Sequence, residues 1–133
     1  MNTCRNGICP KWYVGNAVRD VLVNDENVQR AVGNNIFPII APEGTDGPFI
    51  LYQRDKYKRD YSKMGLFQEE CHLIITVISD DYDTGIVIAD MIDTALSGSV
   101  STEEGCTFEM VLYDSTEGFD DNKYFEQLVF SIK

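Results

Sequence analysis

The sequence has few of the residues and motifs on which most active sites depend. Its 133 residues include a single histidine, His72, and no Gly-x-Ser-x-Gly elbow or Gly-rich phosphate loop. His72 lies in the most apolar stretch of the chain, which favours a packed or edge residue over a general base. We therefore expect no enzyme, no catalytic residue and no cofactor.

The cysteines lack the spacing of a metal site, because the chain contains no Cys-x-x-Cys pair. Cys4 and Cys9 are five positions apart near the N-terminus, while Cys71 is adjacent to His72. Neighbouring side chains of a strand point to opposite faces, so Cys71 and His72 could not easily bind one ion. We expect Cys71 and Cys106 to be small apolar fillers and the other two cysteines to be incidental thiols. A zinc site that uses Cys4, Cys9 and a distant ligand stays open as an alternative.

The acidic clusters do not have the spacing of a calcium loop either. If such a loop began at Asp81, Gly85 and Ile92 would stand where oxygen ligands belong. The acids at positions 80, 81 and 83 are better explained as the start of a helix, because carboxylates are favoured at the positive end of the helix dipole. We therefore expect no metal.

Positive charge and long apolar runs are also scarce. The chain has 11 bases against 22 acids, a formal net charge of -11, which argues against coating duplex DNA. No apolar run approaches the roughly 18 residues of a membrane span, and the first 13 residues lack the apolar core of a secretory signal. With 44% hydrophobic and 25% charged residues, the composition indicates a soluble, acidic, intracellular-type domain without membrane partners.

The apolar periodicity predicts an α+β fold. The expected elements are helices over residues 13–24 and 84–97, a short helical turn over 28–32, and strands over 36–40, 49–57, 67–79, 107–113 and 124–132. Pro38 marks the strand over 36–40 as an edge or bulged strand. Residues 99–105 are expected to be a polar loop, and residues 114–122 an acidic hairpin loop.

These elements combine into one sheet with helices packed on it. We expect a single, mostly antiparallel sheet of four to five strands, two helices and a long projecting β-hairpin. Residues 72–78 form an apolar run that places apolar side chains on both faces of a strand. This strand should therefore be central in the sheet and covered on each side. Residues 1–12 are expected to be a loose extension, and residues 13–133 a single domain.

One stretch differs from the rest in its charge. Residues 54–63 hold five of the 11 bases and only two acids, which leaves 6 bases and 20 acids for the rest of the chain. The stretch should project past the sheet, with its tip over residues 61–65. A regular strand would place Arg54, Lys56 and Lys58 on one face and Tyr57, Arg59 and Tyr61 on the other. The candidate interaction residues are Arg54, Lys56, Tyr57, Lys58, Arg59, Tyr61 and Lys63.

Three interpretations of this stretch stay open. It can dock on an acidic surface, most simply that of a second copy of the protein. It can be a solvated hairpin whose charges prevent aggregation. It can also bind single-stranded nucleic acid, with Tyr57 and Tyr61 as stacking platforms, as a small adaptor or regulator. The excess of acids elsewhere would repel phosphate, and no sequence-specific nucleic-acid binding is expected.

The ordered features resemble a known family of virion proteins. An N-terminal helix is followed by Asn34-Asn35-Ile36-Phe37-Pro38, a Pro/Gly turn and Pro48-Phe49-Ile50-Leu51-Tyr52. A long charged hairpin then returns as the apolar strand Leu73-Ile74-Ile75-Thr76-Val77-Ile78-Ser79. Asp81-Tyr82 comes next, before a helix that ends in Ala95-Leu96-Ser97-Gly98. This order is similar to that of the small tail-completion proteins (tail-terminator, head-tail joining) of long-tailed bacteriophages and prophages. The similarity covers about residues 14–133.

The resemblance implies a structural role. Members of this family are α+β subunits that assemble as a ring, typically a hexamer, between the tail tube and the head connector. The resemblance implies a virion protein made in the cytoplasm of the bacterial host, with the tube and connector proteins and further copies of itself as partners. It also places residues 54–63 at the family's long projecting loop, and the acidic remainder would suit a channel through which DNA passes without sticking.

Overall fold

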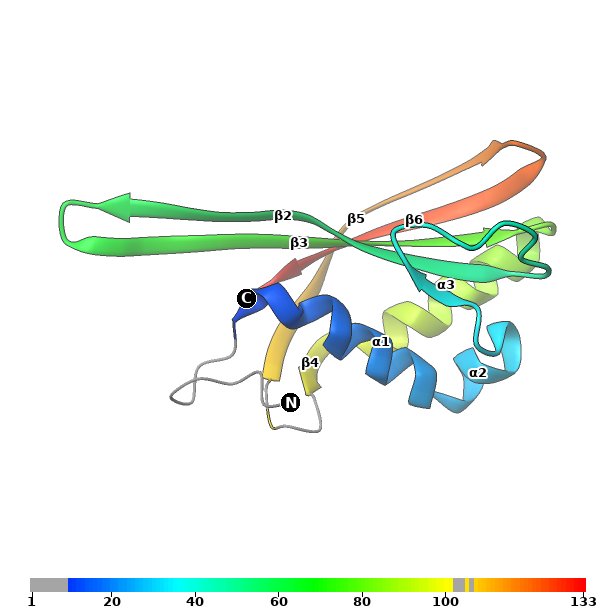
Figure 1. The fold of residues 1–133 in the computed structure, drawn as a ribbon, viewed down its shortest axis with the longest axis horizontal. Helices are drawn as coiled ribbons and strands as arrows, with labels where there is room; N and C mark the ends of the chain where they lie inside the picture. Colours follow the sequence, from blue (N-terminus) through cyan, green and yellow to red (C-terminus); the bar gives the residue numbers. More distant parts are fainter. Residues whose placement is uncertain (1–9, 102–104, 106) are drawn as a thin grey trace.

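The computed structural model describes the whole chain except residues 1–9, 102–104 and 106. The described residues form one sheet with the helices packed on one of its faces (Figure 1). The helices are η1 (Lys11–Tyr13, a 3-10 turn), α1 (Val14–Asn24), α2 (Glu26–Val32) and α3 (Tyr82–Leu96). The strands are β1 (Ile36–Pro38), β2 (Phe49–Ser62), β3 (Gly65–Ser79), β4 (Gly98–Ser101), β5 (Thr107–Asp120) and β6 (Lys123–Ile132).

The sheet has the strand order β1-β2-β3-β6-β5-β4. The β1–β2 pair is parallel and the other pairs are antiparallel. The α+β class and the mostly antiparallel sheet are therefore confirmed, and β1 lies at an edge as Pro38 indicated. The strand and helix counts were too low, because the described residues contain six strands and three α-helices.

Two short elements account for that difference. Residues 26–32 form a separate helix because the Asp25 carboxylate accepts hydrogen bonds from the backbone N–H groups of Asn27 and Val28, which starts a new helix. Residues 99–101, expected as part of a loop, instead form strand β4 together with Gly98, and this strand pairs with residues 107–110. Its sequence, Gly-Ser-Val-Ser, has only one apolar side chain, Val100, which is buried.

The helices bury the stripes that their periodicity predicted. Helix α1 buries Val14, Ala17, Val18 and Leu22, and α3 buries Ile88, Ile92 and Leu96. Asp81 caps α3, as its position in the sequence indicated, because its Oδ2 atom accepts a hydrogen bond from the backbone N–H of Thr84 at 3.0 Å. The helix layer therefore covers one face of the sheet with a continuous apolar core.

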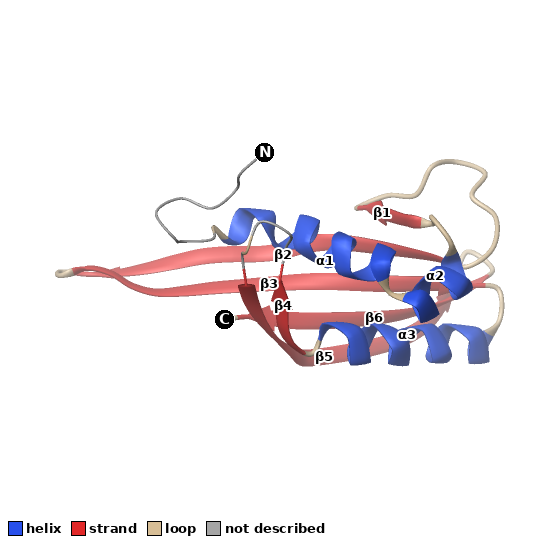
Figure 2. Cartoon of the chain, turned by 90° about the horizontal axis from the view of Figure 1, so that it is seen from below, coloured by secondary structure: helices blue, strands red, loops and turns tan. Residues whose placement is uncertain are grey.

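Strand β3 has two unequal faces. Cys71, Leu73, Ile75 and Val77 are fully buried against the helix layer. The alternate residues, Ile74, Thr76 and Ile78, are half-buried on the other face, and all helices of the described residues lie on the first one (Figure 2). The sequence predicted a strand covered on each side, but no helix of the described residues covers this second face, where the side chains are only half-buried. Side chains of the flanking strand β6, Phe125, Gln127 and Val129, shield this face instead.

The β5–β6 hairpin is longer than the sequence indicated. Strand β5 continues to Asp120, so most of the expected acidic loop is paired strand. Only Asp121 and Asn122 form the turn, with φ angles of 51° and 61°. A two-residue turn with two positive φ angles matches the twist of the flanking strands. The polar composition of residues 114–120 reflects a solvent-exposed strand.

Candidate interaction surface

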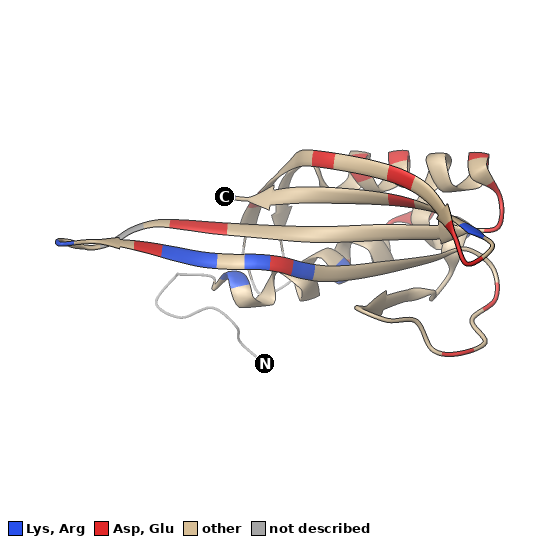
Figure 3. Cartoon of the chain, turned by 90° about the horizontal axis from the view of Figure 1, so that it is seen from above, with Lys and Arg blue, Asp and Glu red and all other residues tan. Residues whose placement is uncertain are grey.

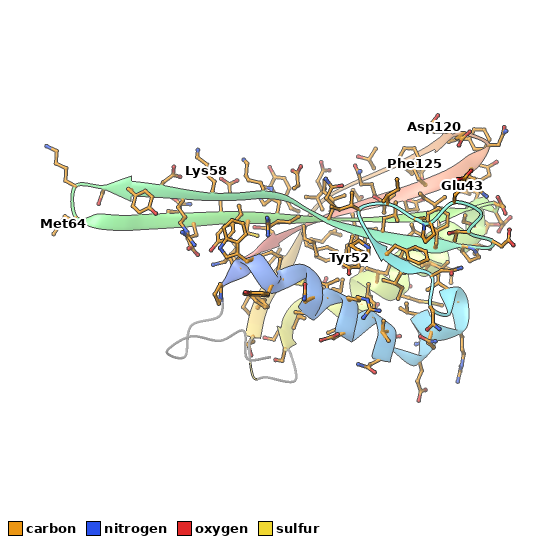
Figure 4. All side chains as sticks on the ribbon, viewed as in Figure 1. Glu43, Tyr52, Lys58, Met64, Asp120 and Phe125 are labelled. Atoms are coloured by element: carbon orange, nitrogen blue, oxygen red, sulfur yellow. The ribbon has the colours of Figure 1, made fainter. Side chains whose placement is uncertain are left out.

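The β2–β3 hairpin extends well past the helices and past the other strands (Figure 1). We call residues 54–70 of this hairpin the arm. It contains all seven candidate interaction residues of the sequence analysis. Figure 4 shows Lys58 along the arm and Met64 at its end, at the side of the molecule opposite to Asp120 and Phe125.

A β-bulge changes the face to which Arg54 points. Arg54 is opposite Leu73 and Lys56 is opposite His72, so Asp55 is an extra residue in β2. Arg54 thus lies on the helix-side face with Tyr57 and Arg59. The prediction that Arg54 shares a face with Lys56 was wrong, because a strict two-residue alternation does not hold across a bulge.

The base of the arm packs on the turn that precedes α1. The guanidinium carbon of Arg54 lies 4.5 Å from the centroid of the Trp12 indole, and its Nη1 atom donates a hydrogen bond to the Trp12 carbonyl oxygen at 3.3 Å. The Trp12 and Tyr57 rings meet edge to face, with centroids 5.1 Å apart. Arg54 and Tyr57 therefore help to hold the arm in place against the rest of the chain.

Glu69 is the centre of a second set of contacts at the same place. Its carboxylate accepts hydrogen bonds from Lys11 Nζ at 2.8 Å, from the Tyr57 hydroxyl at 3.2 Å and from Arg59 Nε at 3.1 Å. The hydrogen bond from Lys11 is the main reason why the pKa of Glu69 is lower than usual. The hydrogen bond with the Tyr57 hydroxyl is the main reason why the pKa of Arg59 is raised.

These contacts were not predicted from the sequence, because Lys11 and Trp12 lie 58 and 45 positions before their partners Glu69 and Tyr57. Both residues fell in the segment expected to be a loose extension. In the structure they belong to η1. A Lys-Trp-Tyr run beside a helix start gives no local sign of what it contacts.

The other face of the arm carries solvent-exposed ion pairs. Lys56 Nζ lies 3.5 Å from Glu70 Oε1, and Lys58 Nζ lies 3.6 Å from Asp60 Oδ1. Glu69 and Glu70 on β3 oppose the bases of β2 (Figure 3). Residues 54–63 alone carry a net charge of +3. The whole arm holds five bases and four acids, a net charge of +1, because the returning strand adds two glutamates.

The tip of the arm exposes apolar and basic side chains. Lys63 and Met64 form the turn, and the backbone N–H of Met64 donates a hydrogen bond to Ser62 Oγ. Met64 is 97% exposed and Tyr61 is 68% exposed. Within the described part of the chain, Lys63 makes no ion pair. The tip thus exposes an apolar side chain, an aromatic ring and a cation to solvent.

The opposite end of the sheet is acidic. Glu117 on β5 pairs directly with Glu126 on β6, and the Tyr82 hydroxyl donates to the Glu117 carboxylate at 2.9 Å. Burial raises the pKa of Glu126 to about 7, and the neighbouring Glu117 contributes further. The described residues here carry acids on both strands of the β5–β6 hairpin, whereas Lys123 is the only base of that hairpin (Figure 3).

A groove of about 430 Å³ lies near this acidic end, where the segment after β1 curls over the sheet. Its lining includes Phe49, Thr76, Ile78 and Phe125 from the sheet, Pro42 and Gly44 from that segment, and Asp120, Asp121 and Lys123. It contains no histidine and no cysteine. The groove is an apolar hollow with an acidic rim and shows no arrangement of catalytic groups.

The described residues show no group of three or more His, Cys, Asp or Glu side chains that could bind a metal ion. Cys4, Cys9 and Cys106 lie outside the described part of the chain, so their expected roles are not tested. Cys71 is fully buried, and burial raises the pKa of its thiol. His72 is half-buried and stacks on Tyr113, with ring centroids 5.1 Å apart. None of the described helices has the length and hydropathy of a membrane span.

Comparison with known families decides the identity of the chain. Residues 16–126 match the model of the family described as Tail completion protein gp17. The chain belongs to this family. The resemblance seen in the sequence is therefore confirmed, and the protein is a virion structural protein of the bacteriophage tail-completion type.

The fold also occurs in a solved structure. The chain is similar to a chain in the virion of a native gene transfer agent (GTA) particle, with a TM-score of 0.72 and 18% sequence identity. The match covers 90% of this chain and 92% of the other. The comparison with curated protein sequences found no match.

Proposed function

We propose that this tail-completion protein is the subunit of a closed ring, a hexamer, that caps the tail tube and stops its polymerisation. The same ring offers a surface to the head connector. Membership of the tail-completion family supports this proposal, as does the likeness of the fold to a chain of a GTA virion. The subunit would be made in the cytoplasm of the bacterial host and would then enter the virion.

The arm is the observation that carries the proposal. An isolated two-stranded hairpin is only marginally stable in water, and this one continues beyond the helix layer with an exposed tip. Contacts of Trp12 and Lys11 hold its base, so it leaves the body of the subunit in a defined direction. A long ribbon of this kind fits a surface that another protein covers after assembly.

The seven candidate residues divide into two roles in this proposal. Arg54, Tyr57 and Arg59 maintain the shape of the arm through contacts with Trp12 and Glu69. The exposed residues Lys56, Lys58, Tyr61 and Lys63 meet the neighbouring subunit, the tube or the connector. The small net charge of the arm favours a protein partner over nucleic acid, and the acidic body is suited to a channel that DNA traverses without binding.

Charge reversal on the exposed face tests the arm. The variant carries Lys56→Glu, Lys58→Glu and Lys63→Glu, because reversal of Arg54 or Arg59 would also break the contacts that hold the base. We expect this variant to have the circular dichroism spectrum of the wild type and to form no rings in negatively stained electron micrographs. Wild-type protein should form rings, alone or on tail tubes.

The matched control has the same change in net charge elsewhere. Arg19→Glu, Arg30→Glu and Lys133→Glu reverse three exposed bases outside the arm, and this control should still form rings. Rings from the arm variant would refute the docking role of the arm. If the wild type instead binds single-stranded oligonucleotides with an affinity that falls steeply with salt, the adaptor function is favoured.

A further inference from the structure

Two strands of the described sheet each have a long edge without a backbone partner. Strand β1 pairs with β2 only at residues 50–52, which leaves residues 53–62 unpaired along the outer edge of β2. Strand β4 pairs with β5 only at residues 107–110, which leaves residues 111–120 unpaired along the outer edge of β5. Each edge presents free N–H and C=O groups to a strand from another molecule.

The two edges carry opposite charge. Residues 53–62 hold four bases and two acids, whereas residues 111–120 hold three acids and no base. They lie toward opposite ends of the molecule, as Lys58 and Asp120 show in Figure 4, and the strand order places them along opposite edges of the sheet. A β-strand edge of one sign and an equally long edge of the other sign are complementary surfaces of the same chain.

We propose that the β2 edge of one subunit pairs antiparallel with the β5 edge of the next subunit, so that the sheet continues around the ring. This inference rests on the proposed ring and names the surface that joins its subunits. The contact is heterologous, since each subunit offers one edge to each neighbour, and such contacts close into rings when the rotation permits. Within a subunit β2 and β5 already run antiparallel, because three antiparallel pairings separate them.

The side chains select one register. Rotation about a ring axis keeps the helices on one side of the continuous sheet, so residues of the same face must oppose each other. On the face away from the helices, β2 presents Lys56 and Lys58, and β5 presents Asp114 and Thr116. Lys58 opposite Asp114 then places Lys56 opposite Thr116.

The bulges of the two strands support this register. Strand β2 has its extra residue at Asp55, and β5 has its extra residue at Tyr113. If both remain unpaired, the register also brings Arg54 opposite Glu117 on the helix-side face. The result is two pairs of opposite charge and no directly opposed pair of like charge. A shift by two residues in one direction would oppose Asp60 to Asp114.

The short strands β1 and β4 limit the contact. Each covers the first part of the neighbouring long strand. In the proposed register, β1 of one subunit and β4 of its neighbour lie beyond opposite ends of the contact and do not collide. Neighbouring subunits are displaced along the strand direction, so the strands must tilt relative to the ring axis, as in any closed barrel.

Disulfide formation between two single variants tests this register. Lys56→Cys protein is mixed with Thr116→Cys protein, both with Cys4, Cys9 and Cys106 replaced by Ser, and the mixture is mildly oxidised. We expect disulfide-linked dimers, because directly opposed residues of adjacent strands have Cβ atoms about 5 Å apart. The matched control mixes Lys56→Cys with Ser115→Cys. Ser115 is also exposed but lies on the other face, so several-fold less dimer is expected.

A charge exchange provides a second readout. Lys58→Asp and Asp114→Lys should each weaken assembly, and the double variant should restore it. Edge pairing would be refuted if wild-type rings form but the Cys variants at positions 56 and 116 give no cross-link and the Lys58/Asp114 double variant does not restore assembly. That result would leave the ring function intact. Absence of rings in the wild type would refute the ring, and the edge pairing with it.

Discussion

The Nζ atom of Lys11 lies 2.8 Å from the Oε2 atom of Glu69, although 58 positions separate the two residues. Both side chains are mostly buried, at 17% and 24% exposure. The contact joins the turn before α1 to the returning strand of the arm. It is therefore part of what fixes the direction in which the arm leaves the subunit.

Loss of the Glu69 charge should loosen this junction. The pKa of Glu69 is lower in the folded protein than in the unfolded chain, chiefly because Lys11 donates to it. Its contribution to stability is therefore present above about pH 4.5 and is lost as the pH falls through the lowered pKa. We expect Glu69→Gln to cost roughly 1 kcal/mol at pH 7 and much less at pH 3. Urea denaturation at the two pH values measures this, and an equal cost at both would contradict it.

Trp12 should stabilise the subunit through ring contacts. It meets the Tyr57 ring edge to face and lies under the Arg54 guanidinium. We expect Trp12→Ala to lower the free energy of unfolding by about 1–2 kcal/mol. The control is Tyr61→Ala, which removes an exposed aromatic ring at the tip and should leave stability unchanged. Similar losses in the free energy of unfolding for Trp12→Ala and Tyr61→Ala would refute the stabilising role of the Trp12 ring contacts.

The acid pair at the other end of the sheet predicts an opposite pH dependence. The pKa of Glu126 is raised to about 7, mainly by burial. The contribution of a raised carboxyl pKa to stability is complete below the unfolded value of about 4.5, declines as the pH rises, and is lost once the pH passes the folded value of about 7. Glu126→Gln should therefore stabilise the protein at pH 8, by no more than about 1 kcal/mol since the group is partly solvated. Thermal denaturation at pH 5 and pH 8 tests this, and a loss of stability at pH 8 would contradict it.

Gly118 should not tolerate a side chain. A Cβ atom at this position would lie 2.5 Å from the Phe125 ring, which covers the glycine from the opposite strand. Gly118→Ala must displace the ring from the lining of the groove, at a cost of about 1–3 kcal/mol. Gly44→Ala is not a suitable control because its φ angle is positive. Ser115→Ala, at an exposed position on the same strand, is a suitable control. An equal loss of stability in Gly118→Ala and Ser115→Ala would refute the steric explanation.

The helices and the central strand could be predicted from the sequence because their signals are local. The stripe from Val14 to Leu22 repeats at three and four positions, and Asp81 stands directly before α3. Strand β3 was recognisable from its continuous apolar run. In each case residues close together in the sequence determine the secondary structure.

The parts that were missed depend on residues far away in the chain. Residues 114–120 are polar, and they form a strand only because β6 pairs with them. Arg54 changes face because of a bulge that no residue type announces. The charge excess of residues 54–63 is offset by Glu69 and Glu70, which lie beside these bases only when the hairpin closes. A local charge count therefore overstated how basic the candidate interaction surface is.

The mass of the protein in solution tests the central claim most directly. Light scattering behind a sizing column, over a wide range of protein concentration at low and moderate salt, gives the number of copies in the assembly. We predict a closed oligomer of about five to seven copies whose size does not grow with concentration. A strict monomer under all these conditions, also in the presence of tail tubes, would contradict the ring.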